Sequence, residues 1–232
     1  MCRKKEFCEV LGTDSSKWDR QCLIRMPSFF EDAVESFSSA VSHLAGGDKV
    51  KSLQALKDCN SESVGKFYIE HGKQSSYFRV GDWRKTRKIN SLLKKKNDTK
   101  KTPPASLNKE VFERDFYRCR YCGLRIITKE VFHQYGRLVG PVNFSTVRSE
   151  IIRNGLTLGL RGVSDHVFPY SLGGKTHMDN LVTSCYSCNF GKWEYKLEQL
   201  DLENPYSRQP KDDGWRGLTE FLPTLKKIKE SP

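Results

Sequence analysis

Two pairs of cysteines in the chain have the spacing of metal-binding thiols. Two residues separate Cys119 from Cys122, and two separate Cys185 from Cys188. Four thiolates complete the tetrahedral coordination of one zinc ion and leave no position open for a substrate, so we expect a structural zinc. The gap between the pairs is far longer than in a compact zinc ribbon, and the alternatives are coincidence and redox-active thiol pairs.

Polar residues surround the second thiol pair. The stretch Ser164–Lys192 reads SDHVFPYSLGGKTHMDNLVTSCYSCNFGK and combines an Asp–His pair, asparagines and a Gly pair with the thiols. We expect a short strand at VSDHVF, a loop with a Gly–Gly turn, a second strand at LVTSC and a helix at CNFGKWEYKLEQL. The zinc would then hold two antiparallel strands and a helix together, with its last two ligands at the junction of strand and helix.

The composition indicates a folded protein with a polyanionic partner. The 232 residues include 13 Phe, 9 Tyr and 4 Trp, which is enough aromatic surface for a core. Lysine and arginine number 40 against 28 acidic residues, for a net charge of +12. Such an excess repels itself, and nucleic acid is the commonest partner that relieves it. The alternative is a merely basic soluble protein.

The cysteine chemistry depends on the compartment. No apolar run approaches the roughly 18 residues of a membrane span. The first residues, MCRKKEFCEV, are basic but lack the apolar region of a secretory signal. We therefore expect an intracellular, cytoplasmic protein, in which metal binding or free thiols are favoured over disulfides for the eight cysteines.

An amphipathic helix is predicted over residues 28–45, because its apolar residues recur at steps of three and four. Ser28 and Glu31 have the spacing of a capping box, and Gly46 and Gly47 supply the end of the helix.

Two further elements are expected before the basic segment of the chain. A shorter helix over Asp48–Lys57 would place Val50, Leu53 and Leu56 on one face. The aromatic-rich stretch Gly65–Trp83 predicts two strands around a His-Gly-Lys-Gln turn.

A basic segment and a Pro pair suggest where the domains divide. Residues 79–101 hold ten lysines and arginines against two aspartates, and TPPAS follows. We therefore expect a basic N-terminal region at 1–103 that binds DNA and sets specificity, and a zinc-containing domain at 104–203 that begins with a helix at LNKEVFERDFYRC. A Pro-rich tail at 204–232 would contain a helix at GLTEFLPTLKKIKE.

The motif residues, taken in order, resemble the HNH endonuclease family, the ββα-metal nucleases. The resemblance rests on VFERDFYRCRYCG and on DHVFPYSLGGKTHMDNLVTSCYSCNFGK, with a CxxC, Asp–His, Pro, Gly–Gly, Asn–Leu, a second CxxC followed by Asn, and Lys in family order. It implies an α+β fold with a ββα-metal core stapled by a four-cysteine zinc. The helical and β-hairpin region predicted from the residues would precede this core.

The resemblance also implies a role for each polar motif residue. His166 would be the general base that takes a proton from water. Asp165 and Asn189 would be the ligands of one catalytic Mg²⁺ or Mn²⁺. Asn180 would brace the loop and orient the base, and Lys192 would face the phosphate backbone. Each residue alone has a plainer explanation as a cap, a turn residue, a structural histidine or a solvated charge.

One departure from the family pattern is the length of the link between the motif ends. About 40 residues separate the first thiol pair from the Asp–His pair, where compact members have far fewer. We expect a short helix around Ser145–Arg153, ended by Asn154 and Gly155. Arg148 and Arg153 would then lie close to the cleavage motif and read bases or clamp phosphates, although a plain surface helix fits equally well.

Other residues that could contact DNA or metal have weaker signals. Sequence-independent phosphate contacts are expected from four basic residues, Arg84, Lys85, Arg87 and Lys88. Their aromatic neighbours fit a core better than a base-stacking platform: Tyr77, Phe78 and Trp83. His177 is expected to be a solvated loop histidine. The remaining cysteines lack a CxxC and are expected to be free buried thiols: Cys2, Cys8, Cys22 and Cys59.

The leading hypothesis is a metal-dependent endonuclease that hydrolyses phosphodiester bonds of double-stranded DNA, as a site-specific restriction-type enzyme. Recognition of modified bases, and a homing or nicking HNH nuclease, are variants of this hypothesis. Cutting both strands with one active site per chain suggests a homodimer, whereas a nicking enzyme could act as a monomer. The alternatives from other classes are a zinc-stabilised nucleic-acid-binding module without catalysis and a thiol redox protein.

Overall fold

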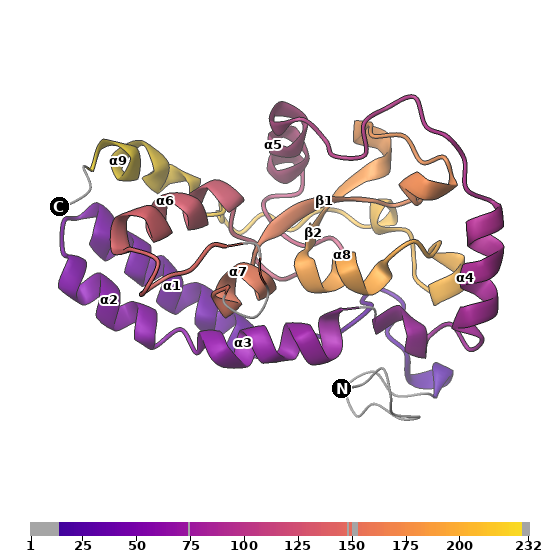
Figure 1. Cartoon of the computed structure of the whole chain (residues 1–232), viewed down its shortest axis with the longest axis horizontal. Helices are drawn as coiled ribbons and strands as arrows, with labels where there is room; N and C mark the ends of the chain where they lie inside the picture. Colours follow the sequence, from indigo (N-terminus) through magenta and orange to yellow (C-terminus); the bar gives the residue numbers. More distant parts are fainter. Residues whose placement is uncertain (1–13, 74, 148, 150–152, 229–232) are drawn as a thin grey trace.

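The computed structural model describes residues 14–73, 75–147, 149 and 153–228. Helices surround a small two-stranded sheet near the middle of the molecule (Figure 1). Helices α1, α2, α6 and α9 lie toward one end, α3 lies below the middle, and α4 lies at the other end (Figure 1). In the described part of the chain, no helix has the length and apolar character needed to cross a membrane.

Helix α1 (Phe29–Ala45) confirms the first predicted helix and buries its apolar face: Phe30, Ala33, Val34, Phe37, Ala40, Val41 and Leu44. Gly47, at a φ of 86°, ends it as expected. The predicted capping box is wrong, because Ser28 itself has helical backbone angles and makes no side-chain cap bond. The carboxylate of Glu31 instead accepts a hydrogen bond from Arg125, with an Nε–Oε2 distance of 2.7 Å.

Helix α2 (Lys49–Lys57) lies where it was predicted, but its buried face is different. Val50 is 81% exposed, whereas Ser52 and Leu56, one turn apart, are buried. Ser52 satisfies its hydroxyl by a hydrogen bond to the Tyr135 hydroxyl at 2.9 Å, which is why a polar side chain is tolerated there.

The predicted aromatic β-hairpin is wrong, because this stretch is helical. It contains the end of α3 (Ser61–Phe67), a π-helical turn (Tyr68–Gly72) and a 3₁₀ turn (Ser75–Phe78). Its aromatic residues pack on other helices, and the rings of Phe67 and Phe30 meet edge to face at 5.2 Å. Helix α3 crosses α7 (Gly155–Gly159) so closely that a Cβ at Gly155 would lie 1.7 Å from the Ser61 carbonyl oxygen.

The link between the two motif ends forms two helices that were not predicted, α6 (Lys129–Val139) and α7 (Gly155–Gly159). The helix expected around Ser145–Arg153 is not seen in the described residues of this range, 145–147, 149 and 153, while 148 and 150–152 lie outside them. Asn154 and Gly155 begin a helix instead of ending one, because the Asn154 side chain accepts a hydrogen bond from the backbone N–H of Leu156 at 3.0 Å and so caps α7.

The main hydrophobic core contains residues from both sides of position 103. Phe37 of α1 packs on three rings of the link, with centroid distances of 5.1 Å to Phe132, 4.9 Å to Tyr135 and 5.6 Å to Phe144. A second, smaller cluster contains Leu23, Val80, Tyr195, Leu200 and Leu202. The N-terminal helices and the link are therefore packed as one body, and the division into domains stays a prediction.

Strand β1 (Gly162–His166) pairs antiparallel with β2 (Leu181–Cys185), which confirms the two predicted strands. Gly162 lies opposite Cys185 and His166 opposite Leu181. Helix α8 (Tyr186–Lys192) follows β2 directly and is shorter than predicted, because Trp193 adopts a φ of 56° and ends it. The chain is thus mostly helical with one small sheet.

The remaining helices frame this sheet. Helix α4 (Trp83–Leu92) carries the basic residues, and α5 (Ala105–Arg114) leads into the first thiol pair as predicted. In the tail, α9 (Leu222–Lys227) forms part of the predicted C-terminal helix and packs against α6.

Candidate active site

The four motif cysteines converge on one point. Their Sγ atoms all lie within 4.8 Å of one another, and those of Cys122 and Cys185 are 3.8 Å apart. A tetrahedral zinc with Zn–S bonds of about 2.3 Å needs sulfurs about 3.8 Å apart. The geometry therefore fits one four-coordinate zinc. Within the described residues, no other group of His, Cys, Asp and Glu side chains is placed to hold a metal ion.

Local backbone structure presents these thiols. The first pair lies in a tight turn in which the Gly123 N–H donates to the Cys119 carbonyl at 2.8 Å, and Gly123 has a φ of 78°. The second pair is at the start of α8. Burial raises the pKa of Cys119, but hydrogen bonds from the other three thiols outweigh it and bring that pKa well below its usual value. The same hydrogen bonds raise the pKa values of Cys122 and Cys188 well above the usual value, so Cys119 is the thiol favoured as a thiolate before a cation binds.

Asp165 is buried and held by two side chains. Its Oδ2 accepts a hydrogen bond from the Tyr121 hydroxyl at 2.8 Å and lies 3.2 Å from the ammonium of Lys192. Burial raises the pKa of the carboxyl, and Lys192 and Tyr121 oppose this shift. Tyr121 lies between the two cysteines of the first pair, so the zinc turn directly orients Asp165.

Lys192 is not placed as the sequence predicted. Its side chain is 1% exposed, and its ammonium donates to the His166 carbonyl oxygen at 2.8 Å as well as pairing with Asp165. The expectation that Lys192 faces the phosphate backbone is therefore wrong, because the charge points into the protein, where it balances a buried carboxylate.

The His166 imidazole has a defined tautomer. Its Nε2 lies 2.9 Å from the Thr176 hydroxyl oxygen, and that hydroxyl donates its single proton to the Lys100 carbonyl at 2.7 Å. Nε2 must therefore be the donor to Thr176, which leaves Nδ1 as the acceptor. Burial, with Lys192 and Lys101 nearby, lowers the pKa of His166 to about 4, so the ring is neutral at pH 7.

Asn180 ties the loop between the strands. Its Oδ1 accepts from the Phe168 N–H at 2.8 Å, and its Nδ2 donates to the carbonyls of Phe168 and Lys175, both at 3.0 Å. The same loop contains Gly174, where a Cβ would lie 2.0 Å from the Phe168 carbonyl oxygen. The bracing that the family resemblance implied is thus present, and it acts on the loop backbone.

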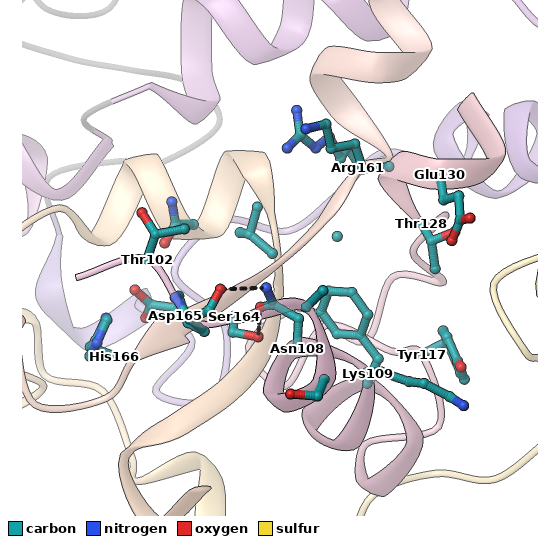
Figure 2. A pocket seen from close by; sticks show the side chains of 18 of the residues that line it. Thr102, Asn108, Lys109, Tyr117, Thr128, Glu130, Arg161, Ser164, Asp165 and His166 are labelled. Carbon is teal, nitrogen blue, oxygen red and sulfur yellow. Dashed lines mark hydrogen bonds between the residues drawn. The ribbon is translucent and has the colours of Figure 1, made fainter. Parts of the chain in front are cut away.

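One groove is lined by three of the five residues predicted for catalysis and cation binding, and its lining does not include Asn180 or Lys192. Its volume is about 1600 Å³, and Asp165, His166 and Asn189 belong to its lining. Figure 2 shows Asp165 and His166 in this groove, with Ser164 of the same strand hydrogen-bonded to Asn108 of α5. Asn189 is half-buried on α8, and its side-chain amide has no hydrogen-bond partner among the described residues. All three residues therefore border the same cavity.

The predicted DNA-contact residues lie elsewhere. Arg84, Lys85, Arg87 and Lys88 are exposed on α4, and the groove lining does not include them. Arg148 is outside the described residues. Arg153 is half-buried, and its Nε donates to the Val147 carbonyl at 2.5 Å.

Most of the residues that were expected to have no catalytic or metal-binding role are placed as expected. His177 is exposed in its loop, 3.2 Å from a carboxylate oxygen of Asp179. Cys22 and Cys59 are buried free thiols, and Cys2 and Cys8 are outside the described residues. Tyr77 and Trp83 stack at 4.2 Å against the smaller hydrophobic cluster, as expected for core residues. Phe78 is half-buried.

Two residues of the site had no assignment from the sequence. Tyr121 orients Asp165, and Thr176 holds His166. Tyr121 could have been singled out by its place between two zinc ligands. Nothing in the sequence marks Thr176, because its partners lie in a distant segment of the chain.

Comparison with known families agrees with this geometry. Residues 162–201 match the family model of the HNH endonucleases. The matched range contains both strands, α8, the Asp–His pair and the second thiol pair, while the first pair lies outside it. No curated protein and no solved structure matches the chain. The match covers 40 of the 232 residues, and over that segment the chain is similar to the HNH endonucleases.

Proposed function

We propose that this protein is a divalent-cation-dependent endonuclease that hydrolyses phosphodiester bonds in double-stranded DNA. The family match implies a nuclease with a nucleic acid substrate. The observation that carries the proposal is the meeting of Asp165, His166 and Asn189 in one groove within the matched segment. The oxygens of a carboxylate and an amide can hold a divalent cation, and a neutral imidazole can take a proton from water, which together serve phosphodiester hydrolysis.

Each residue has a defined task in this mechanism. The oxygens of Asp165 and Asn189 would hold Mg²⁺ or Mn²⁺, which when bound would stabilise charge on the phosphate and the leaving oxygen. The Nδ1 of His166 accepts the proton of the attacking water, while the Nε2–H group keeps its hydrogen bond to the Thr176 hydroxyl. Lys192 fixes the backbone beside His166 and steadies the Asp165 carboxylate.

The four-cysteine cluster supports this site structurally. We propose that it binds one zinc, which joins the turn at Cys119 to the start of α8 at Cys188. Because Tyr121 extends from that turn to Asp165, the zinc also holds a ligand of the catalytic cation in place.

The proposed enzyme is of the restriction type, with residues 1–103 as the region that sets specificity. The net charge of +12 and the exposed cations of α4 support DNA binding outside the groove. A homodimer would supply two such sites for the two strands. We further propose a cytoplasmic location.

The test of this proposal is incubation of the purified protein with modified and unmodified plasmid and phage DNA, with Mg²⁺ or Mn²⁺, followed by mapping of the ends. A restriction-type enzyme leaves ends at one recurring sequence. Ends at random positions would refute the site-specific part of the proposal and leave the nuclease part intact.

A second candidate is a zinc-stabilised nucleic-acid-binding module without catalysis. The ion pair between Asp165 and Lys192 favours it, because a carboxylate that is already balanced attracts a cation less strongly. This candidate predicts DNA binding without cleavage at any Mg²⁺ or Mn²⁺ concentration, so the same incubation separates the two.

Binding of DNA should depend on the exposed lysines that follow α4. Changing Lys94, Lys95 and Lys96 together to Gln should weaken binding similarly on all sequences, because phosphate contacts carry no sequence information. The slope of log affinity against log salt should flatten by about 2 to 3 units. Fluorescence anisotropy over a salt series measures this slope, and unchanged affinity at low salt would mean that the lysines are only solvated.

A further inference from the structure

The segment Lys94–Lys101, here called the basic strap, lies against the loop that follows the Asp–His pair. The Lys95 N–H donates to the Ser171 carbonyl at 3.0 Å, and Asn97 Nδ2 donates to the Gly174 carbonyl at 2.8 Å. These contacts use the backbone and a neutral side chain of the strap. These contacts with the loop therefore do not depend on the charges of the lysines.

A chain of hydrogen bonds continues from the strap to the catalytic imidazole. The Thr176 N–H donates to the Thr99 hydroxyl at 3.2 Å, and the Thr176 hydroxyl donates to the Lys100 carbonyl at 2.7 Å. The same hydroxyl oxygen accepts from His166 Nε2 at 2.9 Å. One small side chain thus joins the strap backbone to His166.

The strap carries an excess of positive charge at its surface. Its five lysines are all exposed: Lys94, Lys95, Lys96, Lys100 and Lys101. Lys94 lies 3.6 Å from Glu194, and the other four have no acidic partner among the described residues. Lys101 also lines the groove. Cations this close repel one another, and a phosphate backbone relieves that repulsion while adding contacts to the same short segment.

We propose that Thr176 is a positioning residue that ties His166 to the basic strap, so that DNA phosphates bound by the strap hold the imidazole in the orientation for proton transfer. The inference rests on the proposed nuclease function. DNA contacts on Lys95, Lys96 and Lys100 fix the backbone that carries the Lys100 carbonyl. The Thr176 hydroxyl transmits this fixed position to Nε2, and Nδ1 is thereby aimed at the attacking water.

Two substitutions separate the hydroxyl from the bulk of the side chain. Thr176→Val keeps the shape and removes the hydroxyl, whereas Thr176→Ser keeps the hydroxyl. At saturating DNA, Thr176→Val should cleave about 10- to 100-fold more slowly in a single turnover, the scale of a small misplacement of a reacting group. Its DNA affinity should stay within about twofold, and Thr176→Ser should keep most of the wild-type rate.

The imidazole itself gives a readout that does not require cleavage. The ¹⁵N shifts of His166 at pH 7.5, assigned by comparison with His166→Ala, should show the Nε2-protonated tautomer in the wild type and in Thr176→Ser. The preference should be lost in Thr176→Val, because Nε2 no longer has its acceptor. A wild-type tautomer in Thr176→Val would overturn the proposed contact.

The coupling to DNA is tested by a double-mutant cycle. Changing Lys95, Lys96 and Lys100 together to Gln removes three charges and keeps the backbone carbonyl at position 100. These changes should slow cleavage even at saturating DNA. The same changes should slow Thr176→Val little further, because the link is already broken. The proposal would be overturned if the lysine changes and Thr176→Val slowed cleavage independently, so that their rate factors multiply in the combined variant. It would also be overturned if Thr176→Ser cleaved as slowly as Thr176→Val. Wild-type protein that shows the tautomer but never cleaves would refute the nuclease function itself.

Discussion

The His166→Ala variant is expected to fold, retain zinc and bind DNA, but to cleave it about a hundred to ten thousand times more slowly than the wild type. The imidazole hydrogen-bonds to Thr176 and packs on the Tyr170 ring at 5.4 Å, and it does not belong to the thiol cluster. Its removal should therefore spare the fold and both metal sites while taking away the proton acceptor, whose usual contribution has this scale. Single-turnover cleavage at saturating DNA measures the effect.

Asn189→Ala is the matched variant for this experiment. It removes an amide oxygen of the proposed cation site and leaves the base in place, so extra Mg²⁺ or Mn²⁺ should restore part of its activity. Excess cation should not rescue His166→Ala, because no ion supplies the missing proton acceptor. Wild-type activity in His166→Ala would refute the role of this residue.

Loss of zinc is expected to destabilise the whole protein. The four thiolates join two segments far apart in the chain, and zinc binding of this kind contributes folding free energy directly. Cys119→Ser should lose the metal, and a cost of about 5 kcal/mol would lower the thermal midpoint by roughly 10–20 °C. Calorimetry together with elemental analysis measures both effects.

Cys59→Ser is the control for this prediction. Cys59 is a buried thiol that donates to the Ala55 carbonyl at 3.3 Å and lies outside the cluster. The same chemical change there should leave one zinc per chain and a midpoint close to that of the wild type. A Cys119→Ser protein that contains zinc, or that melts like the control, would exclude the proposed metal site.

The sequence was most informative where the structure is local. The two strands, the loop between them and the start of α8 fit in fewer than 30 residues, and strand pairing there follows from the pattern alone. The thiol pairs were recognisable because ligand spacing within a turn is fixed by coordination geometry.

Helical packing explains the errors in the secondary structure. Aromatic residues are frequent in strands, but in α3 and the π-helical turn after it they face other helices, and propensity cannot distinguish the two. Helix α6 was missed although its buried residues recur at helical spacing: Val131, Phe132, Tyr135, Leu138 and Val139.

The roles that failed were those that depend on three-dimensional neighbours. A lysine is solvated in most proteins, so the burial of Lys192 follows only once the position of Asp165 is known. Thr176 has the same difficulty, because its partner Lys100 lies in a segment that composition describes simply as a basic linker. The Pro pair near residue 103 marks a change in composition, while the core packs across it.

The most direct measurement is the cleavage of double-stranded DNA by the zinc-loaded protein with Mg²⁺, with EDTA and with Mg²⁺ restored, beside a His166→Ala preparation purified identically. We expect cleavage by the wild type that stops with EDTA and returns with Mg²⁺, and almost none by the variant. Equal cleavage by both preparations would contradict the role of His166, and intact DNA in every condition, despite binding, would contradict the enzyme and favour the binding module.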